Sequence, residues 1–178
     1  YTLQERDMAA NIEKQIITGN TIIGIEMGST RIKAVLIDQD SNPIASGGFT
    51  WENTLNDGIW TYSLDKVWEG VRLSFSSLME NIQAKYQIKP AKVKAIGISG
   101  MMHGYLVFDK DGRQLTPFRT WRNNITGIAS KKLTDLFDYP IPQRWSIAHL
   151  YQSILNNEEH VRDIDYVTTL AGYVHWKL

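Results

Sequence analysis

The chain has 178 residues, of which 43% are hydrophobic and 21% charged, a composition typical of one globular domain or of part of a larger protein. Its 19 basic and 19 acidic residues balance to a formal net charge of +0, whereas a nucleic-acid-binding protein usually carries a basic surplus. Cysteine is absent, which excludes disulfides and thiolate metal sites, and no signal peptide or membrane-spanning run is present, so we expect a cytoplasmic protein with no nucleic-acid or membrane partner.

An amphipathic helix is predicted at the start of the chain. Apolar side chains recur there at roughly helical spacing: Leu3, Met8, Ile12 and Ile16. Gly19 is typical of a residue just past a helix end, so we expect the helix at residues 3–18. Residues 1–19 would then be an N-terminal helical extension, for which packing within a longer chain and contact in a homodimer are both open roles.

Three short strands are predicted next. Ile22–Ile25 and Ile32–Ile37 are apolar runs only a few residues apart, which indicates an antiparallel hairpin. Asp38–Pro43 has the composition of a turn, and Ile44–Thr50 is predicted as the third strand. Together these strands would form one side of a sheet.

A long helix and an apolar strand follow. Ser63 suits the N-cap of a helix, because apolar residues from Leu64 to Ile82 repeat at intervals of three and four. Val93–Gly100 is almost continuously apolar, which predicts a strand covered on both faces. The next segments are predicted as a hairpin and two helices: residues 105–115, 124–137 and 145–158. This order predicts an α/β fold with a mixed sheet, antiparallel strands at its start and flanking helices.

The turn of the first hairpin carries more polar chemistry than a turn needs. Gly28 lets an anion approach the backbone, and Ser29 and Thr30 add hydroxyl donors. Lys33 adds a positive charge, whereas Glu26 would repel a phosphate unless a cation lay between them. A magnesium ion held largely through waters resolves that conflict, so the turn predicts a magnesium–phosphate site.

The alternative is an ordinary hairpin with a solvated tip. The turn is not a Walker A loop, because the G-x-x-x-x-G-K-[ST] spacing is absent. The glycine spacing of a dinucleotide-binding fingerprint is also missing, as is the helix that should follow it.

A second group of candidate residues follows the apolar strand: Met101, Met102, His103 and Gly104. Ligands bind at the ends of central strands in open α/β sheets, which makes this segment a candidate binding site. The alternatives are a hydrogen-bonded structural histidine and methionines that fill the core.

Four stretches together resemble the FGGY family of carbohydrate kinases, most closely its xylulokinase-like branch. GIEMGSTRIK resembles the family's first phosphate loop, G-I-D-x-G-T-[ST]-x-x-K, and GISGMMHG resembles its sugar-binding segment, G-[IL]-S-G-Q-M-H-G. VFDKDGRQLTPFRTW resembles the segment that leads into a W-N-D-x-R run, and GIWTYSLDKVW the stretch before the first long helix. The motifs occur in the family's order and cover roughly residues 20–178.

The resemblance implies the actin-like, ribonuclease-H-like fold of hexokinase-type ATPases. In this family two domains close over ATP, magnesium and a sugar, and the γ-phosphoryl group of ATP passes to a sugar hydroxyl. Residues 20–178 would be the first part of the N-terminal domain, which binds sugar and phosphate, and the C-terminal domain would be absent. The catalytic base is expected beyond Leu178, so we expect this chain alone to be inactive.

The resemblance also implies roles for individual residues. Gly28, Ser29 and Thr30 would cradle the γ-phosphate of ATP, with Lys33 nearby, and Glu26 stands in the position of the magnesium-associated aspartate. The residues implied to line the sugar pocket are Met101, Met102, His103, Gly104, Trp121, Arg122 and Asn123. His103 would hydrogen-bond a sugar hydroxyl, and a pentulose such as xylulose is the first candidate substrate.

The chain departs from the family pattern at four positions. Glu26 replaces an aspartate, Met101 a glutamine, Asn123 an aspartate and Ile125 an arginine. These changes leave a different polyol or a sugar acid as alternative substrates, and a non-catalytic sugar or nucleotide sensor as an alternative function. An actin-like or chaperone-type ATPase is a further alternative, which the sugar-binding segments argue against.

Overall fold

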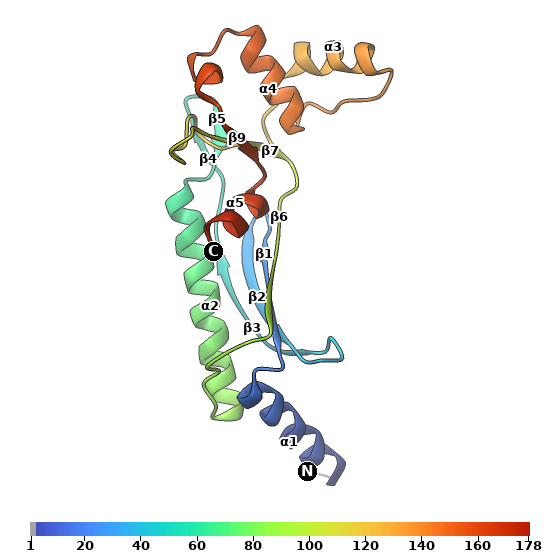
Figure 1. The fold of residues 1–178 in the computed structure, drawn as a ribbon, viewed down its shortest axis with the longest axis vertical. Coiled ribbons are helices and arrows are strands. Elements are labelled where there is room, and N and C mark those ends of the chain that lie inside the picture. Colours follow the sequence, from blue (N-terminus) through green and yellow to red (C-terminus); the bar gives the residue numbers. More distant parts are fainter. Residues whose placement is uncertain (1–2) are drawn as a thin grey trace. The chain divides into compact units, whose positions relative to one another are not determined.

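The computed structural model describes residues 3–178, which divide into two compact units (Figure 1). The first unit comprises the residues up to Trp51 together with Asp65–Ser99, and the second comprises Glu52–Leu64 together with Gly100–Leu178. In chain order the elements are α1 (Leu3–Thr18), β1 (Ile22–Met27), β2 (Arg31–Ile37), β3 (Pro43–Thr50), β4 (Thr54–Asn56), β5 (Ile59–Thr61), α2 (Leu64–Tyr86), β6 (Ala95–Gly100), β7 (Gly104–Phe108), β8 (Arg119–Thr120), α3 (Gly127–Phe137), α4 (Ser146–Leu155), the short 3-10 helix η1 (Glu159–Asp163), β9 (Tyr166–Thr168) and α5 (Leu170–Lys177).

The first unit contains a four-stranded mixed sheet with the strand order β3-β2-β1-β6. β1 and β2 pair as the predicted antiparallel hairpin, from Ile22 opposite Ile37 to Met27 opposite Ile32, and β3 adds to β2 in antiparallel direction. Alternate residues of β1 and β2 are buried, as expected for strands with one face on a core: Ile23, Ile25, Met27, Ile32, Ala34 and Leu36. The helix predicted at residues 3–18 is confirmed as α1.

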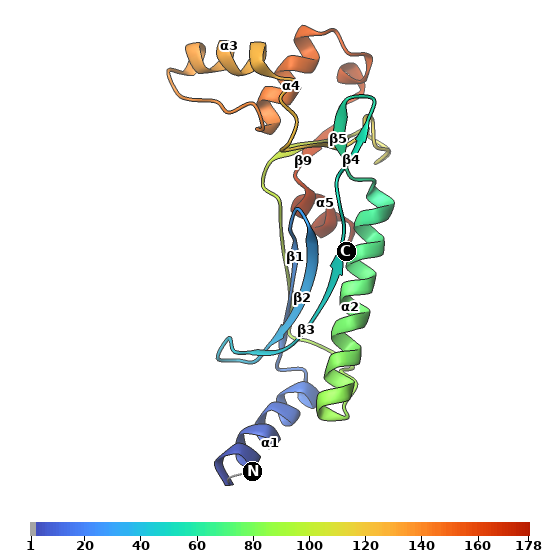
Figure 2. The same ribbon diagram turned by 180° about the vertical axis from the view of Figure 1, so that it is seen from behind.

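Helix α2 runs along the sheet and covers this buried face (Figures 1 and 2). Two glycines allow the helix to approach the sheet closely. A Cβ atom on Gly47 of β3 would overlap backbone atoms of Ser74 and Leu78, and one on Gly70 of α2 would lie 2.5 Å from Cδ1 of Ile32. The long predicted helix is therefore confirmed, and the helix–strand spacing depends on residues without side chains.

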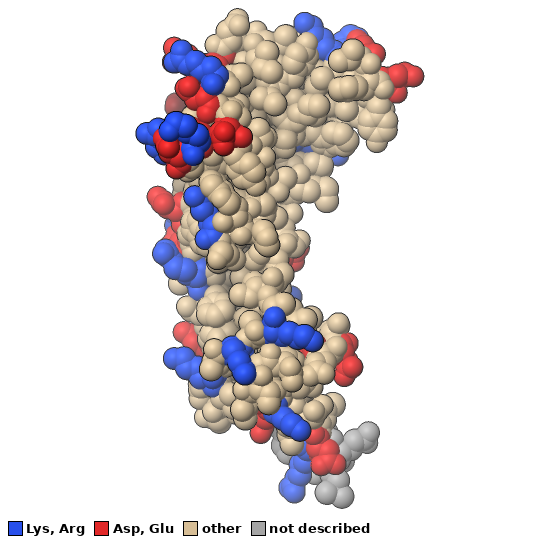
Figure 3. Space-filling view, viewed as in Figure 1, with Lys and Arg blue, Asp and Glu red and all other residues tan. Residues whose placement is uncertain are grey.

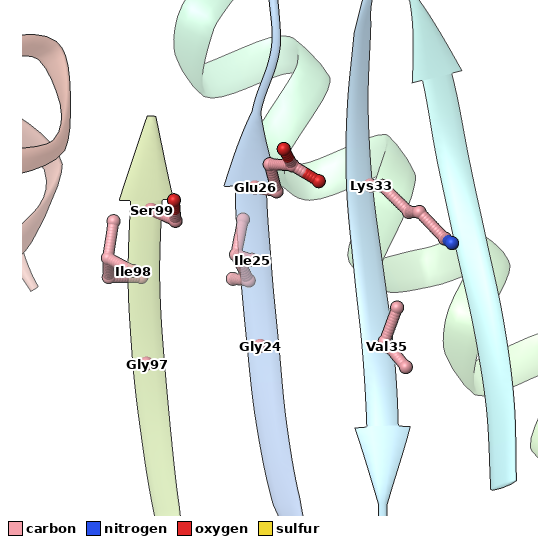
Figure 4. A pocket seen from close by; sticks show the side chains of 8 residues that line it. All are labelled: Gly24, Ile25, Glu26, Lys33, Val35, Gly97, Ile98 and Ser99. Atoms are coloured by element: carbon pink, nitrogen blue, oxygen red, sulfur yellow. The ribbon is translucent and has the colours of Figure 1, made fainter. Parts of the chain in front are cut away.

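Strand β6 is where the structure departs from the sequence-based prediction. The strand itself is confirmed, but its predicted burial on both faces is wrong, because within residues 3–178 β6 pairs with β1 alone, at one side of the sheet, and Ile96 is 48% exposed. β6 runs parallel to β1 (Figure 4). An apolar run indicates a strand, but it does not report how many neighbouring elements cover that strand.

The second unit begins with a hairpin that the sequence analysis missed. β4 and β5 pair antiparallel with Asn56 opposite Ile59, so the connection is the two-residue turn Asp57-Gly58. Both turn residues have positive φ values, 48° and 79°, as a type I′ turn requires. The hairpin places Trp60 of β5 among the residues of the candidate sugar site described below.

A three-stranded sheet with the order β8-β7-β9 forms the centre of this unit, and all five residues of β7 are buried. Of the hairpin predicted at residues 105–115 the turn forms, with the Gly112 amide donating to the Asp109 carbonyl at 3.0 Å. Its second arm pairs irregularly with β7, through the bridge between Phe108 and Gln114 and the hydrogen bond from the Leu115 amide to the Val107 carbonyl at 3.0 Å. Further along the chain β8 pairs with the start of β7, and β9 pairs with the other side of β7. The predicted helices at 124–137 and 145–158 are present as α3 and α4.

A buried polar network crosses the second unit. The guanidinium of Arg119, whose residue is 5% exposed, forms a salt bridge with Glu158 and donates to Oγ of Ser153 at 3.0 Å. The Tyr105 hydroxyl lies 3.0 Å from Nε2 of His160, whose Nδ1 is 3.5 Å from the Glu158 carboxylate. The network ties β7 and β8 to α4 and η1, so it fixes the elements from which the candidate sugar site extends.

Charges on the face drawn in Figure 3 are mixed, with Lys and Arg interspersed among Asp and Glu. This distribution agrees with the balanced formal charge of the sequence. None of the helices in the described part of the chain is long and apolar enough to span a membrane.

Candidate functional site

The turn between β1 and β2 is held by its own backbone and by Trp51. The Gly28 amide donates to the Arg31 carbonyl at 2.9 Å, and the Gly28 carbonyl accepts a hydrogen bond from Nε1 of Trp51, also at 2.9 Å. The Trp51 amide donates to the Thr30 carbonyl at 3.1 Å. Gly28 therefore supplies turn geometry and room, since its own N–H is already used within the turn.

Trp51 itself was not identified from the sequence. It is 5% exposed and lies directly after β3, and both its indole and its backbone N–H bond to the turn. The signal that could have found it is a tryptophan placed one residue after the strand that flanks the candidate loop.

Glu26 and Lys33 lie directly opposite each other in the β1–β2 register. Both side chains are exposed and leave the sheet on the face that α2 does not cover, and Figure 4 shows the Lys33 ammonium extending toward β3, away from the Glu26 carboxylate. Neither side chain forms a salt bridge within the described residues. They border a hollow of about 380 Å³ on this face, lined by Gly24, Ile25, Glu26, Lys33, Val35, Gly97, Ile98 and Ser99.

The residues of this face can hold magnesium only together with a ligand. Among residues 3–178 no three His, Asp or Glu side chains come together as a metal cage. Mg²⁺ is usually bound through one or two carboxylates, waters and the phosphates of its substrate, and a single exposed carboxylate above an open hollow fits that mode. The donor set at Glu26 therefore suits a magnesium–phosphate complex and does not suit a metal held by protein atoms alone.

The second group of predicted residues gathers at one end of the β7–β8 ladder. Gly104 pairs with Thr120 in antiparallel register, so His103 and Trp121, the residues just outside this pair, lie at the same end. Gly104 has a φ of +131°, and a Cβ there would lie 2.7 Å from the Phe118 ring and 2.8 Å from the Arg119 carbonyl. The position therefore requires glycine.

The start of α4 joins this cluster. Oγ of Ser146 donates to the Gly104 carbonyl at 2.5 Å, and the Trp145 ring stacks on the His103 imidazole with centroids 6.4 Å apart and planes 23° apart. Partial burial and then the positive charge of Arg144 lower the pKa of His103 below its ordinary value of 6.5. His103 is therefore a neutral imidazole near pH 7, with one donor and one acceptor available for hydroxyl groups. Sequence reasoning did not identify Arg144 or Trp145.

Asn123 has a different environment from the one predicted. Its residue is 2% exposed, its Oδ1 accepts from the Trp60 amide at 2.9 Å, and its Nδ2 donates to the Trp60 carbonyl at 2.8 Å and to the Thr120 carbonyl at 3.0 Å. Its side chain is therefore committed to holding β5, and we no longer expect it to contact a sugar directly. The Arg122 guanidinium in turn lies 4.2 Å from the centroid of the Trp60 ring.

Two apolar members of the cluster are exposed. Met102 is 74% exposed and Trp121 is 42% exposed, while Met101 is partly buried. The alternative of core filling therefore does not describe Met102. A large exposed thioether and an indole beside a neutral imidazole provide the mixed apolar and polar surface on which sugar rings and chains bind.

Replacing Asn123 with aspartate tests its structural role. Aspartate keeps the acceptor for the Trp60 amide, but it loses both donors and places a negative charge in a buried site, so we expect a loss of about 2 kcal/mol in the free energy of unfolding. Asn124→Asp is the matched control, because Asn124 is exposed and should change stability by less than about 0.5 kcal/mol. Equal effects of the two variants in urea unfolding would contradict the assignment.

Comparison with known families identifies the domain. The model for the N-terminal domain of the FGGY family of carbohydrate kinases matches residues 21–142, a span that begins after α1 and includes both groups of candidate residues.

Individual relatives agree with this match. A glycerol kinase of Limosilactobacillus reuteri is 26% identical over 126 residues, covering 69% of this chain and 24% of the relative. A xylulose kinase of Staphylococcus epidermidis is 26% identical over 117 residues, covering 65% of this chain and 23% of the relative. The chain thus spans about a quarter of the length of these curated relatives.

A solved structure shows the same fold. The xylulose kinase from Rhodospirillum rubrum superposes with a TM-score of 0.74 over 89% of this chain and 34% of that chain, at 17% sequence identity. This likeness confirms the predicted α/β fold of the actin-like type.

Proposed function

The chain therefore belongs to the FGGY family of carbohydrate kinases, and we propose that the full-length protein transfers the γ-phosphoryl group of ATP to a sugar hydroxyl. The observation that carries the proposal is the exposed carboxylate of Glu26, which is the penultimate residue of β1, lies beside a hydroxyl-bearing turn and borders an open hollow. Phosphoryl transfer depends mainly on positioning and charge neutralisation. The hydroxyls of the turn can position a phosphate, and the carboxylate can hold the metal ion that neutralises its charge.

The roles proposed for the turn follow from its donors and charges. Glu26 would hold Mg²⁺, largely through waters, and the bound ion would offset the negative charge of the nucleotide phosphates. The hydroxyls of Ser29 and Thr30 would donate to phosphate oxygens, and Lys33 would add a positive charge to the same face. Gly28 would leave the backbone accessible to the phosphate.

The roles proposed for the second unit concern the sugar. His103 would hydrogen-bond a sugar hydroxyl, while Met102 and Trp121 would provide the apolar wall, beside the backbone of Gly104 and Met101. A pentulose such as xylulose is the first candidate substrate. No aspartate of the chain matches the family's base, so we expect the proton of the attacking hydroxyl to pass to a base outside these 178 residues. A cytoplasmic location and a homodimer involving α1 remain proposals.

The proposal is tested by sugar-dependent release of ADP from the full-length protein with Mg²⁺ and a panel of pentuloses, polyols and sugar acids. We expect Glu26→Gln to lower kcat about 100-fold, because the neutral amide no longer attracts the metal. Glu80→Gln, at an exposed position of α2, is the control and should keep the parent rate. Unchanged turnover in Glu26→Gln would contradict the role of Glu26, and turnover with none of the sugars would contradict the proposed reaction.

A non-catalytic sensor is the second candidate, favoured by the longer Glu26 in place of the family's aspartate. The same panel distinguishes the two functions. A sensor would show stabilisation of the protein by nucleotide or sugar in thermal-shift measurements, without sugar-dependent release of ADP.

A further inference from the structure

Positive charge gathers around the candidate sugar cluster without a carboxylate to balance it. Arg122 and Arg144 are both exposed, and neither forms a salt bridge with any residue between Leu3 and Leu178. The other arginines of this unit differ, since Arg113, Arg119 and Arg162 each pair with an acid. The two unpaired guanidiniums are thus a local feature of the cluster.

Arg122 stacks on an aromatic residue of the cluster, and Arg144 adjoins another in the sequence. The Arg122 guanidinium stacks over Trp60, whose backbone is fixed at both its N–H and its carbonyl by Asn123. Arg144 directly precedes Trp145, which stacks on His103. A guanidinium that rests on an aromatic face loses little further freedom when it binds an anion, and its remaining N–H groups stay available.

The sequence around Arg122 also indicates an excess of positive charge at this site. The family run W-N-D-x-R carries one acid and one base, whereas the corresponding WRNNI carries one base and no acid. The position of the family's acid is occupied by the neutral Asn123, which is committed to Trp60, and Ile125 occupies the position of the family's arginine. This segment is therefore more positive by one charge than the family pattern.

We infer that the substrate of this site is an anionic sugar, a polyhydroxy chain that carries a carboxylate, and that Arg122 and Arg144 determine this specificity. The inference rests on the proposed sugar-kinase function and names its substrate class. An arginine fork binds a carboxylate through two parallel hydrogen bonds, which a neutral pentulose or polyol cannot offer. His103 and Trp121 would then contact the hydroxyls and the carbon chain of the same molecule.

Binding of a matched pair of compounds to the full-length protein tests the inference. Xylonate and xylitol differ only in having a carboxylate or a hydroxymethyl group at one end. Isothermal titration at low salt should show xylonate binding about tenfold more tightly, because hydrogen bonds to charged groups are the stronger ones. The advantage should shrink at high salt, since both arginines are exposed. Equal or weaker binding of xylonate would overturn the inference.

Variants distinguish the specific effect of the two arginines on substrate preference from a general effect of positive charge. Arg122→Gln and Arg144→Gln should each reduce the ratio of xylonate to xylitol affinity several-fold. Arg113→Gln should leave the ratio unchanged, because Arg113 belongs to the turn after β7, at the opposite end of that strand from Gly104. An equal reduction in all three variants would show a non-specific charge effect and overturn the assignment.

Binding is measured independently of turnover. Failure of the anionic-substrate proposal can therefore be distinguished from failure of the sugar-kinase proposal. Phosphorylation of neutral sugars together with a preference for xylitol would keep the kinase and overturn the anionic substrate. Preferential binding of xylonate without ADP release would support the substrate class and contradict catalysis. Tighter binding of a sugar phosphate than of xylonate would overturn the choice of a carboxylate.

Discussion

Replacing Gly47 with alanine is expected to lower the free energy of unfolding by about 3 kcal/mol, among the largest effects of any single methyl group added to this chain. Gly47 lies in β3 where α2 crosses it, and a Cβ there would overlap the backbone nitrogen of Leu78 and the carbonyl oxygen of Ser74. Backbone atoms of a helix cannot turn aside as a side chain can. The helix and the sheet would have to separate, which loosens the contacts around the fully buried Leu78.

Gly24→Ala provides the matched control for this prediction. Gly24 lies in β1 of the same sheet, separated from β3 by β2, and a Cβ there would meet no atom within 4 Å. The control should stay within about 1 kcal/mol of the parent protein, because alanine also reduces the entropy of the unfolded chain. Native-state hydrogen exchange of peptides from β2 and β3 measures both variants in the full-length protein. Similar protection in the two variants would contradict the close approach of α2 to β3.

The parts of the fold that the sequence predicted well are those with strong local patterns. The β1–β2 hairpin and α2 follow from apolar periodicity with a clear turn or cap, and both were confirmed. The β4–β5 hairpin was missed although Asp57-Gly58 is a recognised turn signal, because arms of only three residues are too short to establish an alternating pattern. The exposure of β6 was also missed, since burial depends on neighbouring elements that a strand's own residues do not specify.

The candidate site shows the same division between local and long-range information. Motif spacing identified Glu26, the penultimate residue of β1, and His103, which directly precedes β7. The role of Asn123 depends on Trp60, 63 residues away in the sequence, and no spacing rule connects the two. Arg144 was missed for the same reason, because the hydrogen bond from Ser146 to Gly104 and the stacking of Trp145 on His103, both long-range contacts, bring that segment to the cluster.

His149 makes the second unit sensitive to acid. It lies in α4 with 0% exposure, its ring is stacked on Tyr105 with centroids 6.0 Å apart, and neither ring nitrogen has a hydrogen-bond partner in the described part of the protein. Burial, and then the positive charge of Arg119, lower the pKa of His149 from 6.5 to about 4, while the Glu158 carboxylate opposes this shift. The folded protein therefore keeps this imidazole neutral under conditions in which the unfolded chain would protonate it.

The sign of the pH dependence follows from these two pKa values. Between pH 6.5 and pH 4 the unfolded chain binds a proton at His149 that the folded state does not bind, so the free energy of unfolding falls as the solution is acidified. The full loss attributable to this residue is about 3 kcal/mol. Glu158 contributes at lower pH: burial raises its pKa, but the hydrogen bond and charge of Arg119 outweigh burial and hold the pKa below 4.5, so its contribution is lost as pH falls further.

Replacing His149 with phenylalanine should remove the loss between pH 6.5 and pH 4. The apolar ring fills a similar volume and leaves no unsatisfied nitrogen, so we also expect about 1 kcal/mol of added stability at pH 7. Hydrogen exchange of peptides from α4 and β7 at pH 7, 5.5 and 4.5, corrected for the intrinsic rate, measures the effect. His175→Phe, at an exposed position of α5, should retain the acid sensitivity of the parent. An undiminished loss in His149→Phe would mean that another group, such as His160 beside Glu158, titrates in this range.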